Sequence, residues 1–378
     1  TGASNTATGK QALTANTTGA NNTAHGSRAL LTNTTAAGNT AVGDDALLLN
    51  TTGANNVAVG YAALDANTTG QRNTAVGQQS FSTNTTGSYN TALGRSALFS
   101  NTTADNNTSV GYEALYANTT GTGNVAVGAL TLDAATTATQ NTALGYNAMS
   151  ATTTGSYNTA VGSGVLSLHT TGASNTAVGY GAMADLTTGG NNTALGQDAL
   201  ANITTTAGNT AIGKATLVAS VTGSNNTALG YLALTACLDG GNNVAVGVSA
   251  GTAVTSGASN TFVGALAGDA TDDGAENVAV GMSALSANCG DGNTAVGKDA
   301  GEAITGANNT VLGKSAGKAV TGGSNNMFLG VDAGLTGSPG GNITTGSNAI
   351  VLGDENIGDA HIQVDWTVAS DARDKTDF

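Results

Sequence analysis

A glycine that returns every 17 residues constrains this chain of 378 residues more than any other feature of its sequence. The glycine ends the string Asn-Thr-Ala-Val-Gly or a variant of it, and from Gly9 to Gly281 it recurs every 17 residues without interruption. Less regular spacings then lead to Gly353, which closes the last of 21 copies. A repeat of fixed length is typical of a solenoid, in which each repeat forms one coil stacked on the next.

The composition excludes most other classes of protein. The chain holds 56 Gly and one Pro, and only 4% of its residues are aromatic, so large side chains are too few to fill a globular core. The glycines follow no triplet spacing, which excludes collagen, and no run of about 18 apolar residues exists to form a membrane-spanning helix. The net charge of −14 argues against nucleic acid as a partner.

Each repeat predicts one short strand followed by turns. Thr-Ala-Val alternates between the two faces of a strand, and the glycine closes it. The Ala-Leu pair that follows predicts a second short extended segment, and Asn-Thr-Thr-Gly is a turn signal. We therefore predict an all-β fold, a repetitive parallel β-solenoid (β-roll) with a 17-residue coil. At the usual strand spacing of about 4.8 Å, the stacked coils would form a rod about 100 Å long.

The repeated columns predict the inside of the rod. Two neighbouring copies contain Asn39, Ala41, Val42 and Gly43, and Asn56, Ala58, Val59 and Gly60. The Asn occurs in 20 of the 21 copies, which predicts a ladder of stacked amides. The Val column, together with the Leu four residues after the glycine, predicts one narrow core. The Ala column would then face the other way, and we expect it to be buried where three chains pack around one axis, as a homotrimer.

These repeats resemble those of bacteriophage tail fibres, and they are similar to the Asn-Ser-Val-Ala-Ile-Gly repeats of trimeric autotransporter adhesin heads. The resemblance covers residues 1–353 and implies a left-handed parallel β-roll assembled as a trimer.

A second resemblance lies at the C-terminal end. Residues 370–378 look like the opening of the intramolecular chaperone domain that ends many phage tail fibres and tailspikes. In that family a Ser and a Lys five residues later form a self-cleaving dyad, and the match carries over to Ser370 as nucleophile and Lys375 as general base. Apart from this self-cleavage we expect no enzyme activity.

Four regions follow one another along the chain. Residues 1–247 carry Ala-Leu after the glycine, and residues 248–334 often carry Ala-Gly instead. Residues 335–353 contain an irregular insertion and the last repeat, and residues 354–378 would form a neck and the start of the chaperone region. The last region holds 9 charged residues in 25, against 25 in the preceding 353, which supports a boundary there.

The predicted function is that of a structural and adhesive fibre, a trimeric tail-fibre shaft that attaches a virion to its host cell. The partners would be further copies of the chain and a glycan or protein receptor on the host, and the location would be the tail of the virion. The alternative is a bacterial surface adhesin or other extracellular fibre. A weaker hypothesis is ice binding by the Thr pairs that recur on one edge, such as Thr17 and Thr18. Because Thr1 falls in mid-repeat, we expect an anchor upstream.

Candidate site residues are few. Five tyrosines share the position after the glycine and would line one outer edge, where exposed Tyr suits sugar stacking and hydrogen bonding; a surface role without a ligand is the alternative. They are Tyr61, Tyr112, Tyr146, Tyr180 and Tyr231. The three His are isolated, so we predict no metal site and no cofactor. Cys237 and Cys289 lie about three coils apart and are predicted to be free thiols.

Overall fold

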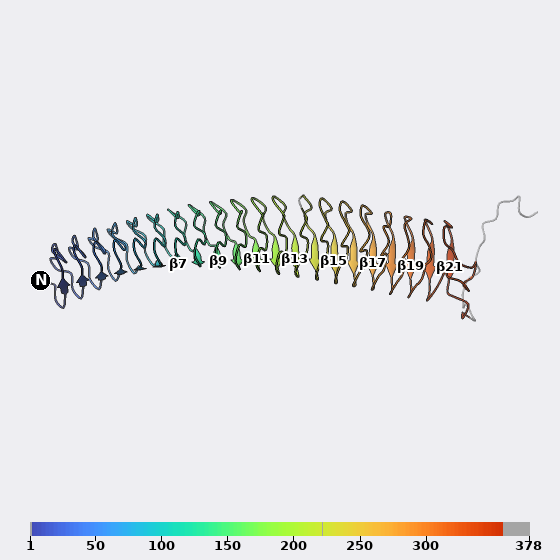
Figure 1. Ribbon diagram of the computed structural model, residues 1–378, viewed down its shortest axis with the longest axis horizontal. Helices are drawn as coiled ribbons and strands as arrows, with labels where there is room; N and C mark the ends of the chain where they lie inside the picture. Colours follow the sequence, from blue (N-terminus) through green and yellow to red (C-terminus); the bar gives the residue numbers. More distant parts are fainter. Residues whose placement is uncertain (1, 221, 358–378) are drawn as a thin grey trace, which may run out of the picture.

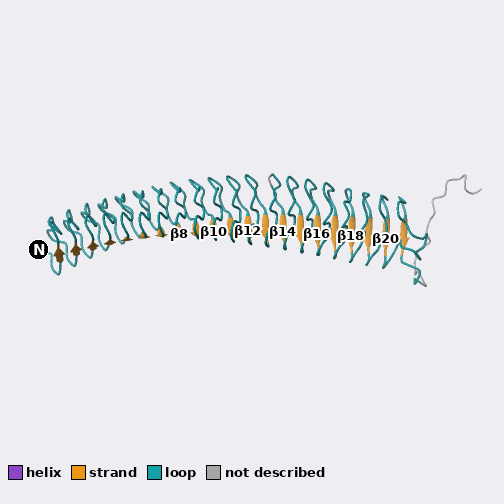
Figure 2. Cartoon of the chain, viewed as in Figure 1, coloured by secondary structure: helices purple, strands orange, loops and turns teal. Residues whose placement is uncertain are grey.

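The computed structural model describes residues 2–220 and 222–357, which form one gently curved rod. Successive coils stack along the rod from the N-terminal to the C-terminal end, with the strands along one side and the loops on the other (Figure 1). The described residues contain strands and turns and no helix, as Figure 2 shows. The predicted all-β parallel solenoid with a 17-residue coil is therefore confirmed.

Every coil contributes one strand of three residues to a single parallel sheet. The strands are β1 (Thr6–Thr8), β2 (Thr23–His25), β3 (Thr40–Val42), β4 (Val57–Val59), β5 (Thr74–Val76), β6 (Thr91–Leu93), β7 (Thr108–Val110), β8 (Val125–Val127), β9 (Thr142–Leu144), β10 (Thr159–Val161), β11 (Thr176–Val178), β12 (Thr193–Leu195), β13 (Thr210–Ile212), β14 (Thr227–Leu229), β15 (Val244–Val246), β16 (Thr261–Val263), β17 (Val278–Val280), β18 (Thr294–Val296), β19 (Thr310–Leu312), β20 (Met327–Leu329) and β21 (Ile350–Leu352). Each strand pairs with the next one along the chain, so that equivalent residues such as Ala41 and Ala58 lie opposite each other.

The Ala and Val columns lie on the opposite sides of the strand from those we predicted. Ala41 and Ala58 are fully buried, whereas Val42 and Val59 are partly exposed. The interior of the coil already holds the Leu four residues after the glycine, such as Leu47, which is also fully buried. In so narrow a space the inward position of the strand has room for Ala only. The predicted Val core is therefore wrong, and so is the argument that placed Ala at the axis of a trimer.

The segment after the glycine was predicted to be extended, and the structure shows turns there instead. The Leu of this segment has left-handed backbone geometry, with φ of 53° at Leu47 and 54° at Leu64. Its amide still bonds to the next coil, as in the 3.0 Å contact from Leu47 N to Ala63 O. The stack of coils thus satisfies the backbone without a second strand.

The glycine that defines the period is required by close approach of the coils. Gly43 has a φ of +140°, and a Cβ added to it would lie 2.3 Å from the carbonyl oxygen of Gly60. No side chain fits between the two backbones, and L-residues rarely adopt this φ. The same close contact recurs in neighbouring coils, which explains why the glycine does not vary.

The predicted Asn ladder is confirmed. Asn39 is fully buried, and its Oδ1 accepts a 2.8 Å hydrogen bond from the backbone N–H of Asn56 in the next coil. Its Nδ2 donates a 3.0 Å bond to the carbonyl oxygen of Gly53. Each side chain therefore satisfies a backbone donor and a backbone acceptor that have been removed from water.

A second ladder runs through the turn, where we predicted no buried function for the Asn of Asn-Thr-Thr-Gly. The Nδ2 of Asn50 donates a 3.0 Å bond to Oδ1 of Asn33, and Asn67 repeats the contact to Asn50 at 2.8 Å. This ladder reaches Asn118 and ends at the following coil, where Ala135 takes the equivalent position.

In the later coils the large core side chain moves to the strand. Gly251 and Gly268 stand where earlier coils carry Leu, and the ring of Phe262, which replaces the inward Ala of β16, fills the adjacent space. A Cβ on Gly268 would lie 2.5 Å from that ring. Phe328 of β20 does the same beside Gly334. The change in the repeat therefore exchanges one core residue for another.

Candidate functional site

The outer face of the sheet is the most unusual surface of the molecule. Each strand presents two outward side chains, the first of which is Thr in most strands. The second is Val, Leu or Ile in all 19 strands from β3 to β21. Within the 21 described strands, no outward position holds Asp, Glu, Lys or Arg, although the chain has 34 such residues in total. We call these two columns the strand face.

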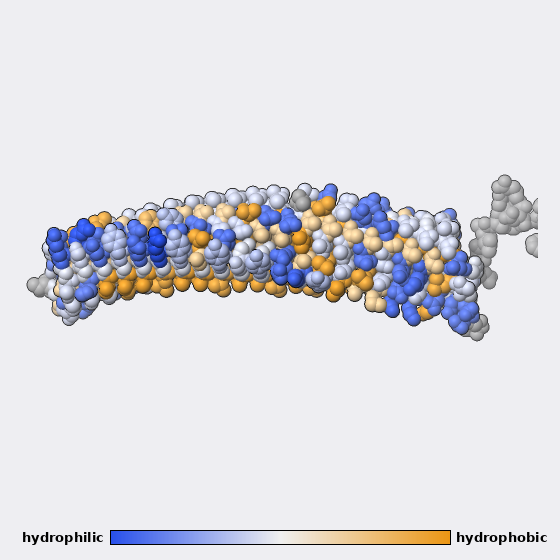
Figure 3. Space-filling model, viewed as in Figure 1, coloured by the Kyte–Doolittle hydropathy of each residue, from blue (hydrophilic) through white to orange (hydrophobic). Residues whose placement is uncertain are grey.

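The aliphatic column of the strand face is substantially exposed. Leu144 is 46% exposed and Leu195 is 47% exposed. Figure 3 shows the consequence as an apolar stripe along one edge of the rod. With 21 strands at about 4.8 Å and a width of about 10 Å, this face covers on the order of 1,000 Å². The aliphatic column alone makes up about half of it, about 500 Å², which is as large as the largest apolar patch of a typical monomer, about 300–600 Å².

The five predicted tyrosines lie on a different surface, just after the glycine that ends each strand. All five are exposed, as predicted for an outer edge: Tyr61, Tyr112, Tyr146, Tyr180 and Tyr231. They are not equivalent, however. The guanidinium of Arg95 stacks over the ring of Tyr112, 5.6 Å from its centroid. Two others, Tyr146 and Tyr180, line the same groove.

The two residues of each Thr pair proposed for ice binding differ in their contacts. Oγ1 of Thr17 donates a 2.9 Å hydrogen bond to the carbonyl oxygen of Thr34 in the next coil, and both Thr17 and Thr18 are exposed. The same bond recurs along the rod, for example from Thr51 to Thr68 at 3.0 Å, where Thr51 is half-buried and Thr52 exposed. The hydroxyl of the first Thr of such a pair is therefore used to bond neighbouring coils together.

Three buried titratable side chains lie apart from one another. His169 occupies the position of the turn Asn beyond the end of the second ladder, and burial lowers the pKa of its imidazole to about 4. Its Nδ1 lies 3.0 Å from Oγ1 of Thr152. Cys237 and Cys289 are both buried and free, as predicted, and burial raises the pKa of the Cys237 thiol to about 11. Such a thiol is inert at neutral pH.

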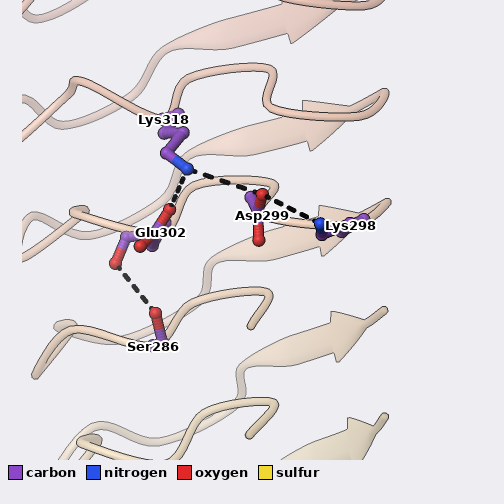
Figure 4. A network of polar contacts seen from close by, with 5 residues as sticks. All are labelled: Ser286, Lys298, Asp299, Glu302 and Lys318. Atoms are coloured by element: carbon purple, nitrogen blue, oxygen red, sulfur yellow. Dashed lines mark hydrogen bonds and ion pairs between the residues drawn. The ribbon is translucent and has the colours of Figure 1, made fainter. Parts of the chain in front are cut away.

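Charged side chains cluster on the surface of the later coils. Figure 4 shows Nζ of Lys318 between two carboxylates, 2.6 Å from Oε2 of Glu302 and 3.5 Å from Oδ2 of Asp299. Lys298 lies 3.9 Å from the same oxygen of Asp299. These partners are partly exposed, so each pair contributes little to stability. The network connects neighbouring coils of the rod.

Three remaining points concern metal ligands, membrane-spanning helices and the predicted dyad. Among residues 2–220 and 222–357, no three His, Cys, Asp or Glu side chains come together as metal ligands would. The same part of the chain has no helix long and apolar enough to cross a membrane. Ser370 and Lys375, predicted as a self-cleaving dyad, lie outside the described residues.

Comparisons with known proteins give no further assignment. No protein-family model matches the chain, and no match was found among curated proteins or solved structures.

Proposed function

We propose that this chain is the shaft of an attachment fibre, in which several copies pack through their strand faces. The observation that carries the proposal is the uncharged strand face along the whole described solenoid. An isolated rod would gain from charges on this face, because charged residues keep proteins soluble and protect strands from unwanted association. Their complete exclusion from both columns, over 21 strands, fits a face that is covered by other copies.

The size of the strand face is sufficient for a permanent assembly. A stable protein–protein interface buries about 800 Å² on each partner, and the strand face offers on the order of 1,000 Å² per chain. Its aliphatic and Thr side chains are uncharged, so packing would desolvate no charge. The charged residues among those the structure describes lie on other surfaces, and the net charge of −14 would keep the assembled rods apart in solution.

The number of copies and the biological setting come from the resemblance of the repeats. Phage tail fibres and trimeric adhesin heads contain three chains, and three flat faces can close around one axis. A rod about 100 Å long, held together by backbone and amide ladders, suits a shaft that holds a receptor-binding surface away from a virion. The proposed function is therefore attachment of a phage to its host.

Immunogold electron microscopy can test this function with an antibody raised against the purified rod. In a lysate that contains both virions and bacterial debris, we expect the label on the fibres of virion tails. Label confined to bacterial surfaces would refute the phage assignment and support a bacterial adhesin.

A further inference from the structure

A groove of about 420 Å³ opens between two exposed tyrosines in the middle of the rod. Tyr146 and Tyr180 stand on either side of it, 59% and 65% exposed. They occupy equivalent positions two coils apart, which corresponds to about 9.6 Å along the rod. The coil between them carries Ser163 at that position, so no large side chain separates the two rings.

Two glycines make the groove possible, and the backbone does not require either of them. Gly164 and Gly181 stand two residues after the repeat glycine, with φ of +64° and +63°. The neighbouring coils hold Asn147 and Asp198 at the same position, with φ of 57° and 55°. Among the 21 copies this position is Gly in these two adjacent coils alone. The missing side chains therefore clear a space, and a Cβ on Gly164 would meet no atom within 4 Å.

The remaining walls of the groove are small and polar. Beside the two tyrosines and two glycines they include Asn147, Ser163, Ser167 and Asp198. Oδ2 of Asp198 accepts a 2.9 Å bond from Nε2 of Gln197, and its Oδ1 lies over Gly181. The groove thus combines two aromatic rings with hydroxyl, amide and carboxylate groups, within the usual volume of small-molecule sites, about 300–1,000 Å³.

We propose that this groove binds a neutral oligosaccharide. A sugar ring has an apolar face of C–H groups, which packs on an aromatic ring, and an edge of hydroxyls, which needs donors and acceptors. The spacing of the tyrosines, about 9.6 Å, is close to the length of a disaccharide, so each ring can contact alternate sugars of one extended chain. Ser163, Ser167 and Asp198 supply hydroxyl and carboxylate partners between them.

The charge of the groove determines which class of carbohydrate it can bind. The lining residues include Asp198 and neither Lys nor Arg. An acidic sugar would therefore meet a carboxylate without a compensating cation, which disfavours sialylated or uronic-acid chains. The proposal deepens the attachment function by naming the receptor chemistry, and it rests on that function only for the biological source of the glycan.

The test begins with the full chain on an array of immobilised short oligosaccharides, neutral and acidic. We expect selective retention on one or more neutral oligosaccharides. The tightest of these is then titrated in solution by calorimetry against the variants. Retention only on acidic sugars, or on none, would overturn the proposal.

Two variants place the binding in this groove. The double substitution Tyr146→Ala and Tyr180→Ala should weaken binding by about tenfold for each ring removed. Gly164→Asn should weaken it by about tenfold or more with both rings intact, because a side chain then occupies the groove. This variant should fold normally, since Asn147 has the same backbone geometry in the previous coil.

The matched control is the double substitution Tyr61→Ala and Tyr231→Ala, which removes two exposed tyrosines of the same column outside the groove. We expect unchanged affinity. Equal losses in the control and the groove variants, or no loss in either, would refute the site. Glycan binding is measured on the chain alone, so its failure is distinguishable from an immunogold result that refutes the phage assignment.

Discussion

Removal of one side-chain amide from the buried Asn ladder should lower the local stability of the rod. The substitution Asn107→Ala tests this prediction. Asn107 is fully buried and lies just before β7. Its Oδ1 accepts a 2.9 Å bond from the backbone N–H of Asn124, and its Nδ2 donates a 2.9 Å bond to the carbonyl oxygen of Gly121. The substitution leaves the buried N–H of Asn124 without this partner, whereas the carbonyl oxygen of Gly121 keeps a 3.0 Å bond from Nδ2 of Asn118.

The cost follows from these two groups. The unsatisfied N–H costs about 1–3 kcal/mol and the lost second bond to Gly121 O about 1 kcal/mol, so the variant should lose about 3 kcal/mol of local stability. In a solenoid each coil contacts only its neighbours, and the loss therefore stays near β7 and β8 and does not spread along the whole rod. At about 1.4 kcal/mol per factor of ten, hydrogen exchange of the amides in these strands should accelerate about a hundredfold.

Hydrogen exchange followed by mass spectrometry of peptides can measure this change. The matched control is Thr103→Ala in the same coil, because Thr103 is exposed and its loss should change exchange by less than about threefold. If exchange in β7 and β8 of Asn107→Ala stayed within about tenfold of the wild type, the ladder would not stabilise the stack as argued.

Three further predictions concern single positions. Gly111→Ala should lower the free energy of unfolding by about 3 kcal/mol or more, because the added Cβ would lie 2.3 Å from the carbonyl oxygen of Gly128. Gly164→Ala should lower it by only about 1 kcal/mol, because no atom lies within 4 Å of the added Cβ. Chemical denaturation of the two variants measures both changes. The pKa of His169 is about 4 in the folded protein, below the value of 6.5 in the unfolded chain. The free energy of unfolding should therefore fall by about 3 kcal/mol between pH 6.5 and pH 4, as chemical denaturation can measure. His169→Asn should remove this pH dependence. Cys237 should react with a thiol reagent at neutral pH only after denaturation, and fast labelling of the native rod would contradict its burial.

The period and the amide ladder could be predicted from the sequence because both are one-dimensional patterns. An Asn that returns in step with the glycine must stack on its own copy in the next coil, whatever the path of the chain between them. The structure confirms this for Asn39 and Asn56. The second ladder had the same signal in the recurring Asn of the turn, such as Asn50, but the turn propensity of Asn gave an alternative explanation for it.

The hydrophobicity of the strand residues could not predict which of them face the core. Thr-Ala-Val alternates in either orientation, and the larger Val42 was assigned to the core because hydrophobic residues are usually inside. The space left beside Leu47 decides otherwise, and it depends on turns with left-handed residues that the sequence does not reveal. The absence of charge from both outward columns is visible in the sequence, and it supports the proposal that other copies cover this face.

The groove between Tyr146 and Tyr180 could not be predicted from the sequence either. The tyrosines were recognised as exposed, but their sequence positions did not distinguish Tyr146 and Tyr180 from the other three. The distinguishing signal is the pair Gly164 and Gly181, the only glycines in their column. Its meaning depends on the backbone geometry of that column, because Asn147 shows that a side chain is tolerated there.

The central claim is that the strand face joins copies of this chain, and the mass of the purified chain in solution tests it most directly. Light scattering should give three times 36.3 kDa for the wild type. Leu144→Lys together with Leu195→Lys places two charges in the strand face and should yield monomers, whereas Gln197→Lys, at an exposed position outside that face, should leave the trimer intact. A wild-type monomer, or a trimer that survives both charges in the strand face, would contradict the account.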